Sequence, residues 1–299
     1  MSRFISACTL YQKLSSPRSI EDFPGVSVVE IGRGLNSQEF AEFVGSLVIP
    51  DHVDWSGDFA PERPARLLGE VREMSRHSTD PRYPTRDQYF HTDLGYWGKK
   101  NQFATVLYAP HLEGPVAGTE YIDTSLLLQT AESDFPGITE ILAEGTTVFS
   151  GAKYYTSVLP FKGSPDLIEN TILKTLKDKK CKDLKALVAQ EKRNFPPKCF
   201  PTIPRHPFRG SRCIVIDAPH TVNIKGSKLP RREVQHFISQ FVLKYLDLKP
   251  EELAGRPYYA AHTWKEGQAV IWPQIGTLHR AQASPEGEIL RDMLRGLIY

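Results

Sequence analysis

The 299-residue chain has little cysteine and no long apolar run, and each absence excludes a class of protein. Its four cysteines form no Cys-x-x-Cys pair, and their spacing fits neither a zinc knuckle nor a disulfide-rich scaffold. We therefore expect free thiols in a reducing compartment. No stretch approaches the roughly 18 apolar residues that a membrane-spanning helix needs, so we expect no membrane partner.

The amino-terminal 20 residues also lack the unbroken apolar centre of a secretory signal. They contain Arg3, Lys13 and Arg18 and no acidic residue, which only faintly resembles an organelle transit peptide, so we expect the protein in the cytoplasm. The chain has no internal repeat or low-complexity linker. A hydrophobic content of 40% and a charged content of 24% are typical of a soluble globular protein, and we expect one domain over residues 1–299.

Positive charge is concentrated in one segment. Residues 174–198 contain nine Lys or Arg and three acidic residues, a net +6, so the rest of this +2 chain carries −4. The segment lacks interleaved aromatics, and a partial helical stripe runs through Leu173, Leu176, Leu184 and Leu187. We therefore predict a solvated helix in a basic insert at about 162–200, and no nucleic acid partner. A lid that attracts anionic small molecules is the alternative.

Short elements make up the rest of the pattern. We expect strands at 26–31, 102–108, 146–149, 213–217, 258–264, 268–272 and 290–297. We expect helices at 36–47, 61–77, 124–131, 137–143 and 231–245, the first of them opened by a capping box of Asn36 and Glu39. Because the strands do not alternate regularly with helices, a β-sandwich or barrel with helices packed outside is favoured over a doubly wound sheet.

Three histidines are followed two residues later by an acidic residue. The pairs at 52/54 and 111/113 lie among turn-forming residues, so we interpret them as loop residues. The third pair, His91 and Asp93 in "QYFHTDLGYW", ends an aromatic run that is typical of a strand. Residues two apart on a strand point the same way, so we predict that this pair can share a metal ion.

A metal site needs a third ligand, and His279 in "GTLHRAQ" is the best candidate. Two histidines and one carboxylate on a β scaffold leave three coordination positions open, as in the facial triad of non-haem Fe(II) oxygenases. Zinc could bind the same groups, although no second acid lies beside either histidine to act as a hydrolytic base. Arg291 follows His279 by 12 residues and could clamp the far carboxylate of 2-oxoglutarate.

Four segments, in order, resemble the family of taurine dioxygenase and 2,4-dichlorophenoxyacetate dioxygenase. They are "FHTDLGYW", "PVAGTEYIDTSLLLQ", "IPRHPFRGSRCIVID" and "YYAAHTWKEGQAVIWPQIGTLHRA". A fifth, "FPGVSVVEIGRGLNSQEFAEF", fits the amino-terminal strand and helix of that family more loosely. Two positions differ from its usual pattern. Phe90 precedes His91 where a Trp is usual, and Pro273 and Gln274 follow Trp272 where Asp-Asn is usual.

The resemblance implies a mainly β fold with flanking helices and a double-stranded β-helix (jelly-roll, cupin-like) core. It implies an Fe(II)- and 2-oxoglutarate-dependent dioxygenase that oxidises a C–H bond of a small anionic or amino-acid-like molecule and releases succinate and CO2. By the same resemblance, His91, Asp93 and His279 bind Fe(II), and Thr119 and Arg291 bind 2-oxoglutarate, with O2 as the other co-substrate.

Substrate contacts are expected from three further residues. Tyr96 and Trp97 come just after the His91 segment, and Arg295 lies four residues after Arg291 and so on the same side of a strand. His220 could also line the pocket, whereas His262 is expected on a strand face.

Several alternatives stay open. The same iron site could carry out desaturation or oxidative ring closure in the biosynthesis of natural products, or act on a nucleic acid or a protein. A zinc hydrolase or isomerase and a non-catalytic β-barrel binding protein are rivals from other classes. A homo-oligomer is also possible.

Overall fold

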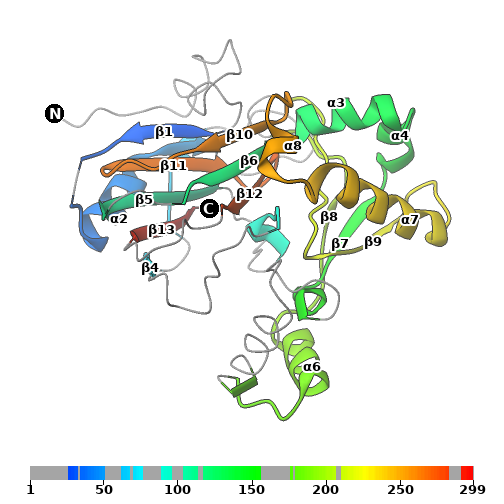
Figure 1. The fold of residues 1–299 in the computed structure, drawn as a ribbon, viewed down its shortest axis with the longest axis horizontal. Helices are drawn as coiled ribbons and strands as arrows, with labels where there is room; N and C mark the ends of the chain where they lie inside the picture. Colours follow the sequence, from blue (N-terminus) through cyan, green and yellow to red (C-terminus); the bar gives the residue numbers. More distant parts are fainter. Residues whose placement is uncertain are drawn as a thin grey trace.

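The computed structural model describes residues 26–32, 34–50, 62–67, 70–76, 89–95, 104–113, 117–155, 176–177, 179–206, 210–282 and 291–298. Strands form the centre of this part of the chain, and helices lie at one side and at the periphery (Figure 1). The predicted substrate residues Tyr96 and Trp97 lie outside the described residues, as does the 52/54 pair.

Within these residues, the largest sheet has five antiparallel strands. In spatial order they are β1 (Ser27–Glu30), β11 (Gln268–Pro273), β5 (Ala104–Leu112), β13 (Arg291–Ile298) and β4 (Arg72–Arg76). The last strand of the chain therefore lies between β5 and β4, and most neighbours in the sheet are distant in sequence. The sheet is held together by non-local pairing, which local residue patterns report only weakly.

Helix α2 (Ser37–Ser46) covers the outer face of this sheet. The Asn36 side chain accepts hydrogen bonds from the first turn, and the Glu39 carboxylate accepts one from the Asn36 N–H, which confirms the predicted capping box. The buried residues between helix and sheet are Phe40, Val44, Leu47, Ala65, Ala104, Val106, Tyr108, Ala269, Leu294 and Ile298.

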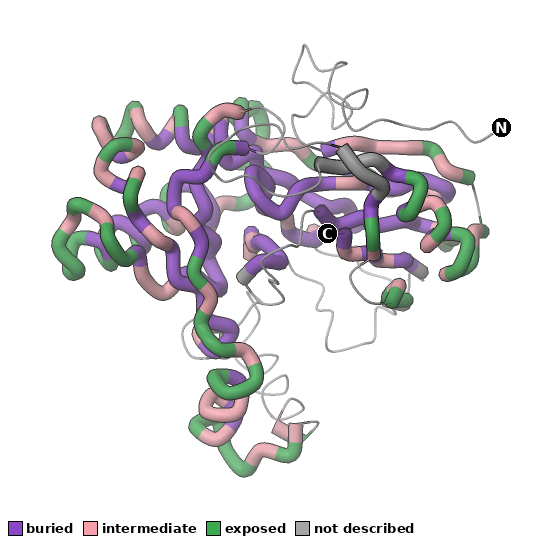
Figure 2. Tube along the Cα trace, turned by 180° about the vertical axis from the view of Figure 1, so that it is seen from behind, coloured by how far each residue is buried: buried purple, intermediate pink, exposed green. Residues whose placement is uncertain are grey.

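A second sheet has three strands in the described residues, in the order β10 (Tyr259–His262), β6 (Thr119–Asp123) and β12 (Thr277–Ala281). One apolar cluster draws on both sheets, so they pack against each other: Val26, Leu107, Ala109, Tyr121, Trp264, Val270, Trp272 and Met293. Figure 2 shows these central strands largely buried. Both sheets contribute residues to the candidate site: His279 lies on β12, Thr105 on β5 and Arg295 on β13.

Helices cover the opposite face of the second sheet, where Ile122 and Leu278 join the largest apolar cluster. They are α3 (Thr124–Asp134), α4 (Ile138–Leu142), α7 (Arg231–Phe241), the π-helical turn η4 (Val242–Leu246) and α8 (Pro250–Leu253). Beside them lies a third sheet with the order β8 (Lys198–Pro201), β7 (Thr146–Phe149) and β9 (Thr221–Lys225), and η3 (Gly151–Tyr155) follows β7. A short pair, β2 (Val48–Pro50) and β3 (Glu62–Pro64), completes the described strands.

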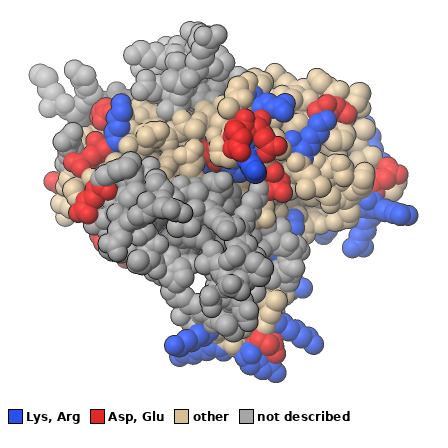
Figure 3. Space-filling view, in the orientation of Figure 1, with Lys and Arg blue, Asp and Glu red and all other residues tan. Residues whose placement is uncertain are grey.

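The basic segment contains a helix, α6 (Leu184–Asn194), as predicted. It projects from the rest of the described chain (Figure 1), and Lys and Arg side chains gather around it (Figure 3). Its exposed residues include Lys185, Lys192 and Arg193. Its inner side buries Leu187 and Glu191, and the Glu191 carboxylate pairs with Lys179 Nζ at 2.5 Å. No helix in the described residues is long and apolar enough to cross a membrane.

Several secondary-structure predictions are wrong, among them the loop at His111, which lies on strand β5. The predicted helix at 61–77 contains β3 and β4 instead, because β4 pairs along β13 and this non-local pairing overrides local helix propensity. The predicted strand at 213–217 is buried but joins no ladder. Its backbone N–H groups donate to separate segments, Ile214 to the Thr124 carbonyl and Val215 to the Thr202 carbonyl. The predicted fold class, mainly β with flanking helices, is confirmed.

Candidate metal centre

His91, Asp93 and His279, which are far apart in the chain, form one cluster. One candidate ligand atom from each residue lies within 4.8 Å of the other two. The ring centroids of the two histidines are 4.4 Å apart. Two imidazoles and one carboxylate at this separation can bind a single metal ion.

The backbone brings the ligands together differently from the prediction. His91 and His279 form an isolated antiparallel bridge, in which each N–H donates to the carbonyl of the other residue at 3.0 Å. Asp93 then begins a 3-10 turn, η2 (Asp93–Gly95), so the predicted strand through residues 91–93 is wrong. A turn, not strand alternation, places the carboxylate beside the imidazoles. His279 itself is the central residue of strand β12.

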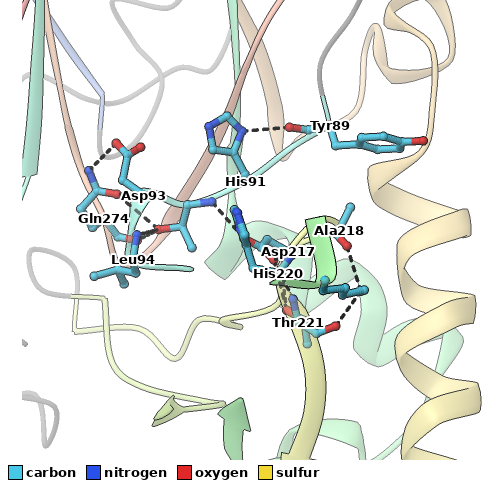
Figure 4. Close-up of polar contacts among 11 residues, drawn as sticks. Tyr89, His91, Asp93, Leu94, Asp217, Ala218, His220, Thr221 and Gln274 are labelled. Carbon is cyan, nitrogen blue, oxygen red and sulfur yellow. Dashed lines mark hydrogen bonds and ion pairs between the residues drawn. The ribbon is translucent and has the colours of Figure 1, made fainter. Parts of the chain in front are cut away.

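The two imidazoles are suited to metal binding. His91 Nδ1 lies 2.9 Å from the Tyr89 carbonyl oxygen, which can only accept a hydrogen bond, so Nδ1 donates and Nε2 keeps its lone pair (Figure 4). Desolvation lowers the pKa of His91, and desolvation followed by the nearby His91 lowers the pKa of His279 to about 3. Both rings are therefore neutral at neutral pH, as metal ligation requires. Buried His279 Nδ1 has no hydrogen-bond partner among the described residues.

Asp93 is ionised in spite of its burial. Burial alone would raise its pKa, but the Arg295 guanidinium, with His279 and His91, holds the pKa of this carboxyl well below its usual range. Asp93 Oδ1 pairs with Arg295 Nη2. The other carboxylate oxygen, Oδ2, accepts hydrogen bonds from Thr105 Oγ1 at 2.9 Å and Gln274 Nε2 at 3.2 Å. The cluster thus offers two neutral nitrogen donors and one anionic oxygen donor.

A buried ion pair supports the cluster from behind. Arg280 lies on the opposite face of β12 from His279, and its Nε donates to the Glu120 carboxylate. Its guanidinium carbon lies 4.2 Å from the ring centroid of Phe90. The Phe that stands before His91 in place of the usual Trp therefore provides an aromatic face for this cation.

A third histidine, His220, lies beside the cluster. The His220 ring meets the His91 ring edge-on with 6.4 Å between centroids, and His220 Nδ1 lies 2.7 Å from Asp217 Oδ2. Burial would raise the pKa of Asp217, but His220 lowers it. Asp217 also accepts a hydrogen bond from the Thr92 N–H at 3.4 Å, between the two metal ligands (Figure 4). His220 therefore lies beside the candidate site, in agreement with its predicted position near the pocket.

The other predicted residues within the described part of the chain lie on three strands, β6, β10 and β13. Thr119 begins β6, and its hydroxyl accepts a hydrogen bond from Trp264 Nε1 at 3.0 Å. Arg291 begins β13, where its backbone pairs with Leu112. Arg295 lies further along β13, and its side chain reaches the cluster through Asp93. His262 lies buried on β10 and meets Trp264 edge-on, so it is a strand residue as predicted.

Sequence reasoning missed Thr105, Asp217, Trp264 and the role of Gln274. Gln274 carried one signal, since it stands where the resembling family usually has another residue. Thr105 and Trp264 carried none: Thr105 is an ordinary strand residue 12 positions after Asp93, and Trp264 donates to Thr119, 145 positions away.

Comparison with known proteins decides the family. A family model described as "Taurine catabolism dioxygenase TauD, TfdA family" matches residues 33–297. The chain belongs to this family. Its members are Fe(II)- and 2-oxoglutarate-dependent dioxygenases that use O2. The donor set of the His91, Asp93 and His279 cluster fits Fe(II), and the expected enzyme class and cofactors are confirmed at the level of the TauD/TfdA family.

Solved structures share the fold at low sequence identity. A taurine dioxygenase from Burkholderia xenovorans is 13% identical, with a TM-score of 0.53 over 92% of this chain and 75% of that one. AAD-2 in complex with Mn(II) and N-oxalylglycine is 14% identical, with a TM-score of 0.54 over 93% of this chain and 83% of that one. Identity this low shows a common fold and no more.

A curated relative matches a shorter stretch. Pentalenolactone F synthase from Streptomyces arenae is 30% identical over 99 residues, which are 29% of this TauD/TfdA-family chain and 26% of that protein. The chain therefore matches only about a quarter of the length of this relative.

Proposed function

We propose that this protein is an Fe(II)- and 2-oxoglutarate-dependent oxygenase that oxidises a C–H bond of a small anionic or amino-acid-like molecule and releases succinate and CO2. The observation that carries the proposal is the cluster of His91, Asp93 and His279, with both imidazoles neutral and the carboxylate ionised. Membership of the TauD/TfdA family supports it.

In this proposal the three residues hold Fe(II) and leave three coordination positions open for co-substrates. Bound iron, together with 2-oxoglutarate and O2, supplies the oxidising power for C–H cleavage. The chain contributes ligand geometry, charge and a site from which water is excluded. Asp93 supplies the one anionic ligand, and His91 is oriented by its hydrogen bond to the Tyr89 carbonyl.

Thr119 and Arg291 are proposed to bind 2-oxoglutarate. Because the Thr119 hydroxyl oxygen already accepts the Trp264 N–H, its own proton is directed elsewhere and can be donated to a carboxylate. Arg291 would supply the charge-assisted pair, from a position on β13 four residues before the Arg295 that reaches the metal cluster.

Arg295 is proposed to bind an anionic group of the substrate. Its guanidinium has five N–H donors, and Asp93 pairs with one of its nitrogens, so the remaining donors can serve a second anion. An acidic substrate would therefore lie close to the iron ligands. Tyr96 and Trp97 are proposed as further substrate contacts on the strength of their position in the sequence alone.

We also propose the core fold, the domain bounds and the position of the basic insert. The two facing sheets support a double-stranded β-helix core within a single domain over residues 1–299. The projecting helix α6 supports a basic insert at about 162–200, proposed as a solvated surface helix with a lid for anionic molecules as the alternative. A cytoplasmic location and a homo-oligomer stay predictions.

A second candidate keeps the iron site and changes the outcome. The stretch similar to pentalenolactone F synthase favours a substrate from the biosynthesis of natural products, with desaturation or oxidative ring closure as the reaction. Hydroxylation would add one oxygen atom to the substrate, whereas desaturation or ring closure would remove two hydrogen atoms. Mass spectrometry of the product therefore separates the two candidates.

The test is a screen for succinate release. The Fe(II)-loaded protein is incubated with 2-oxoglutarate, air and a panel of amino acids, sulfonates, aryloxy acids and natural-product acids. At least one compound should accelerate succinate formation and be oxidised, and the Asp93→Ala variant should give neither result. Equal succinate formation by wild type and Asp93→Ala would contradict the proposal.

A further inference from the structure

Asp93 Oδ2 accepts hydrogen bonds from two side chains, one on β5 and one just after the neighbouring strand β11. Thr105 lies on β5 opposite Trp272 of β11, and Gln274 follows two residues after Trp272. The pairing of β5 with β11 therefore sets the spacing of the two donors. Thr105 and Gln274 are both buried, with 0% and 2% of their surface exposed, so water does not compete for their hydrogen bonds.

Gln274 also holds the backbone of the turn that carries Asp93. Its Oε1 accepts the Asp93 N–H at 3.1 Å, while its backbone carbonyl accepts a hydrogen bond from Thr92 Oγ1 at 3.0 Å. Thr92 Oγ1 in turn accepts the Leu94 N–H at 3.3 Å. Gln274 therefore holds Asp93 and Thr92 directly, and Leu94 through Thr92 (Figure 4).

The orientation of the Gln274 amide follows from its partners. The Asp93 N–H can only donate, so the atom that faces it is the amide oxygen. The ionised Asp93 carboxylate can only accept, so the atom that faces Oδ2 is the amide nitrogen. The same nitrogen donates to Thr105 Oγ1, which leaves the Thr105 proton for Asp93 Oδ2. Each donor in this network meets an acceptor.

We propose that Gln274 and Thr105 are positioning residues that hold Asp93 Oδ2 and so fix the orientation of this carboxylate toward the metal. The other oxygen, Oδ1, pairs with Arg295. The two donors withdraw charge from the carboxylate and restrict its rotation, which sets both the geometry and the donor strength of this ligand. The inference rests on the proposed iron site and adds two residues to it.

The test measures metal binding and a spectrum, and it needs no substrate. Wild type, Gln274→Leu, Thr105→Val and Gln274→Asn are titrated anaerobically with Fe(II), then with 2-oxoglutarate. Removal of a hydrogen bond to a ligating carboxylate should weaken Fe(II) binding by about 10–100-fold. The visible charge-transfer band should move to longer wavelength in Gln274→Leu and Thr105→Val, because a carboxylate with fewer hydrogen bonds donates more charge to iron.

Two matched variants control for the loss of a buried polar group. Gln268 begins β11, the strand that Gln274 follows, is 4% exposed and donates to Glu30 instead of the metal turn, so Gln268→Leu should leave the band unchanged. Thr147 is buried and donates to Thr202 at 3.0 Å, so Thr147→Val controls for Thr105→Val. Gln274→Asn keeps the amide on a side chain one methylene shorter and should restore part of the affinity.

The outcomes separate this inference from the proposed function. If wild type binds Fe(II) and forms the band but Gln274→Leu and Thr105→Val match it in both, the positioning role is wrong and the iron site stands. If wild type forms no band, the proposed function fails first. If Gln274→Leu does not fold, Thr105→Val decides, since Val replaces Thr on β5 at nearly equal volume.

Discussion

Arg280 lies over the ring of Phe90, and this one contact joins the backs of two metal-ligand segments. Arg280 directly follows His279, and Phe90 directly precedes His91. The cation is buried, is paired with buried Glu120, and donates to the Leu248 carbonyl at 3.0 Å. The Arg280–Glu120 ion pair therefore supports the relative position of the two histidines from behind the His91–His279 bridge.

Replacement of Arg280 should destabilise the fold. Arg280→Met leaves the Glu120 carboxylate buried without its cation, which typically costs about 3–5 kcal/mol. Chemical denaturation of the metal-free protein measures the loss. The double variant Arg280→Met/Glu120→Leu should recover much of it, because both charges are then removed together. A single variant as stable as wild type would show that the pair contributes nothing to the stability of this site.

Arg291→Ala should raise the requirement for 2-oxoglutarate. Loss of a charge-assisted pair costs about 1.5–3 kcal/mol, or roughly 10–150-fold in affinity. Anaerobic titration of the Fe(II)-loaded variant with 2-oxoglutarate, followed by the visible band, gives the affinity. Arg291→Lys should lie between wild type and Arg291→Ala because it keeps the charge and loses the fork geometry. An unchanged requirement would assign the clamp to another arginine.

Acid should weaken the metal-free fold through His279. Its folded-state pKa of about 3 lies below the unfolded value of about 6.5, so between these pH values the unfolded chain binds a proton that the folded chain does not. Stability from this group is complete above about pH 6.5 and falls as the pH falls toward 3. Asp93 adds no slope above about pH 5, because it is ionised in both states there.

The measurement is the unfolding free energy of the metal-free protein at pH 7.5 and pH 5. Wild type should lose on the order of 1–2 kcal/mol more than His279→Gln over this interval. The comparison uses the difference between the two pH values, so any constant effect of the substitution cancels. Equal pH slopes for the two proteins would mean that His279 does not titrate between folded and unfolded states as described.

The three residues of the candidate metal cluster could be picked from the sequence because each lies in a short, recognisable segment. His91 and Asp93 are two residues apart, and His279 lies in "GTLHRAQ". The backbone that joins them could not be predicted, since the bridge between His91 and His279 links residues from distant parts of the chain. The hydrogen bonds from Thr105 and Gln274 to Asp93 could not be predicted for the same reason, because they depend on the pairing of β5 with the distant β11.

The errors in the fold share this cause. Residues 61–77 have a local pattern compatible with a helix, yet β4 takes its hydrogen bonds from β13 at the other end of the chain. Residues 213–217 are apolar and extended, as a strand would be, but their backbone partners come from several segments. Residues 36–47 were predicted correctly because the capping box of Asn36 and Glu39 is a local signal.

The central claim is that His91, Asp93 and His279 bind iron together with 2-oxoglutarate. Anaerobic addition of Fe(II) and then 2-oxoglutarate tests it most directly through the weak visible charge-transfer band of the complex. Wild type should develop the band, while Asp93→Ala and His279→Gln, each folded by circular dichroism, should not. Absence of the band in wild type, or a band of equal strength in Asp93→Ala, would contradict the claim.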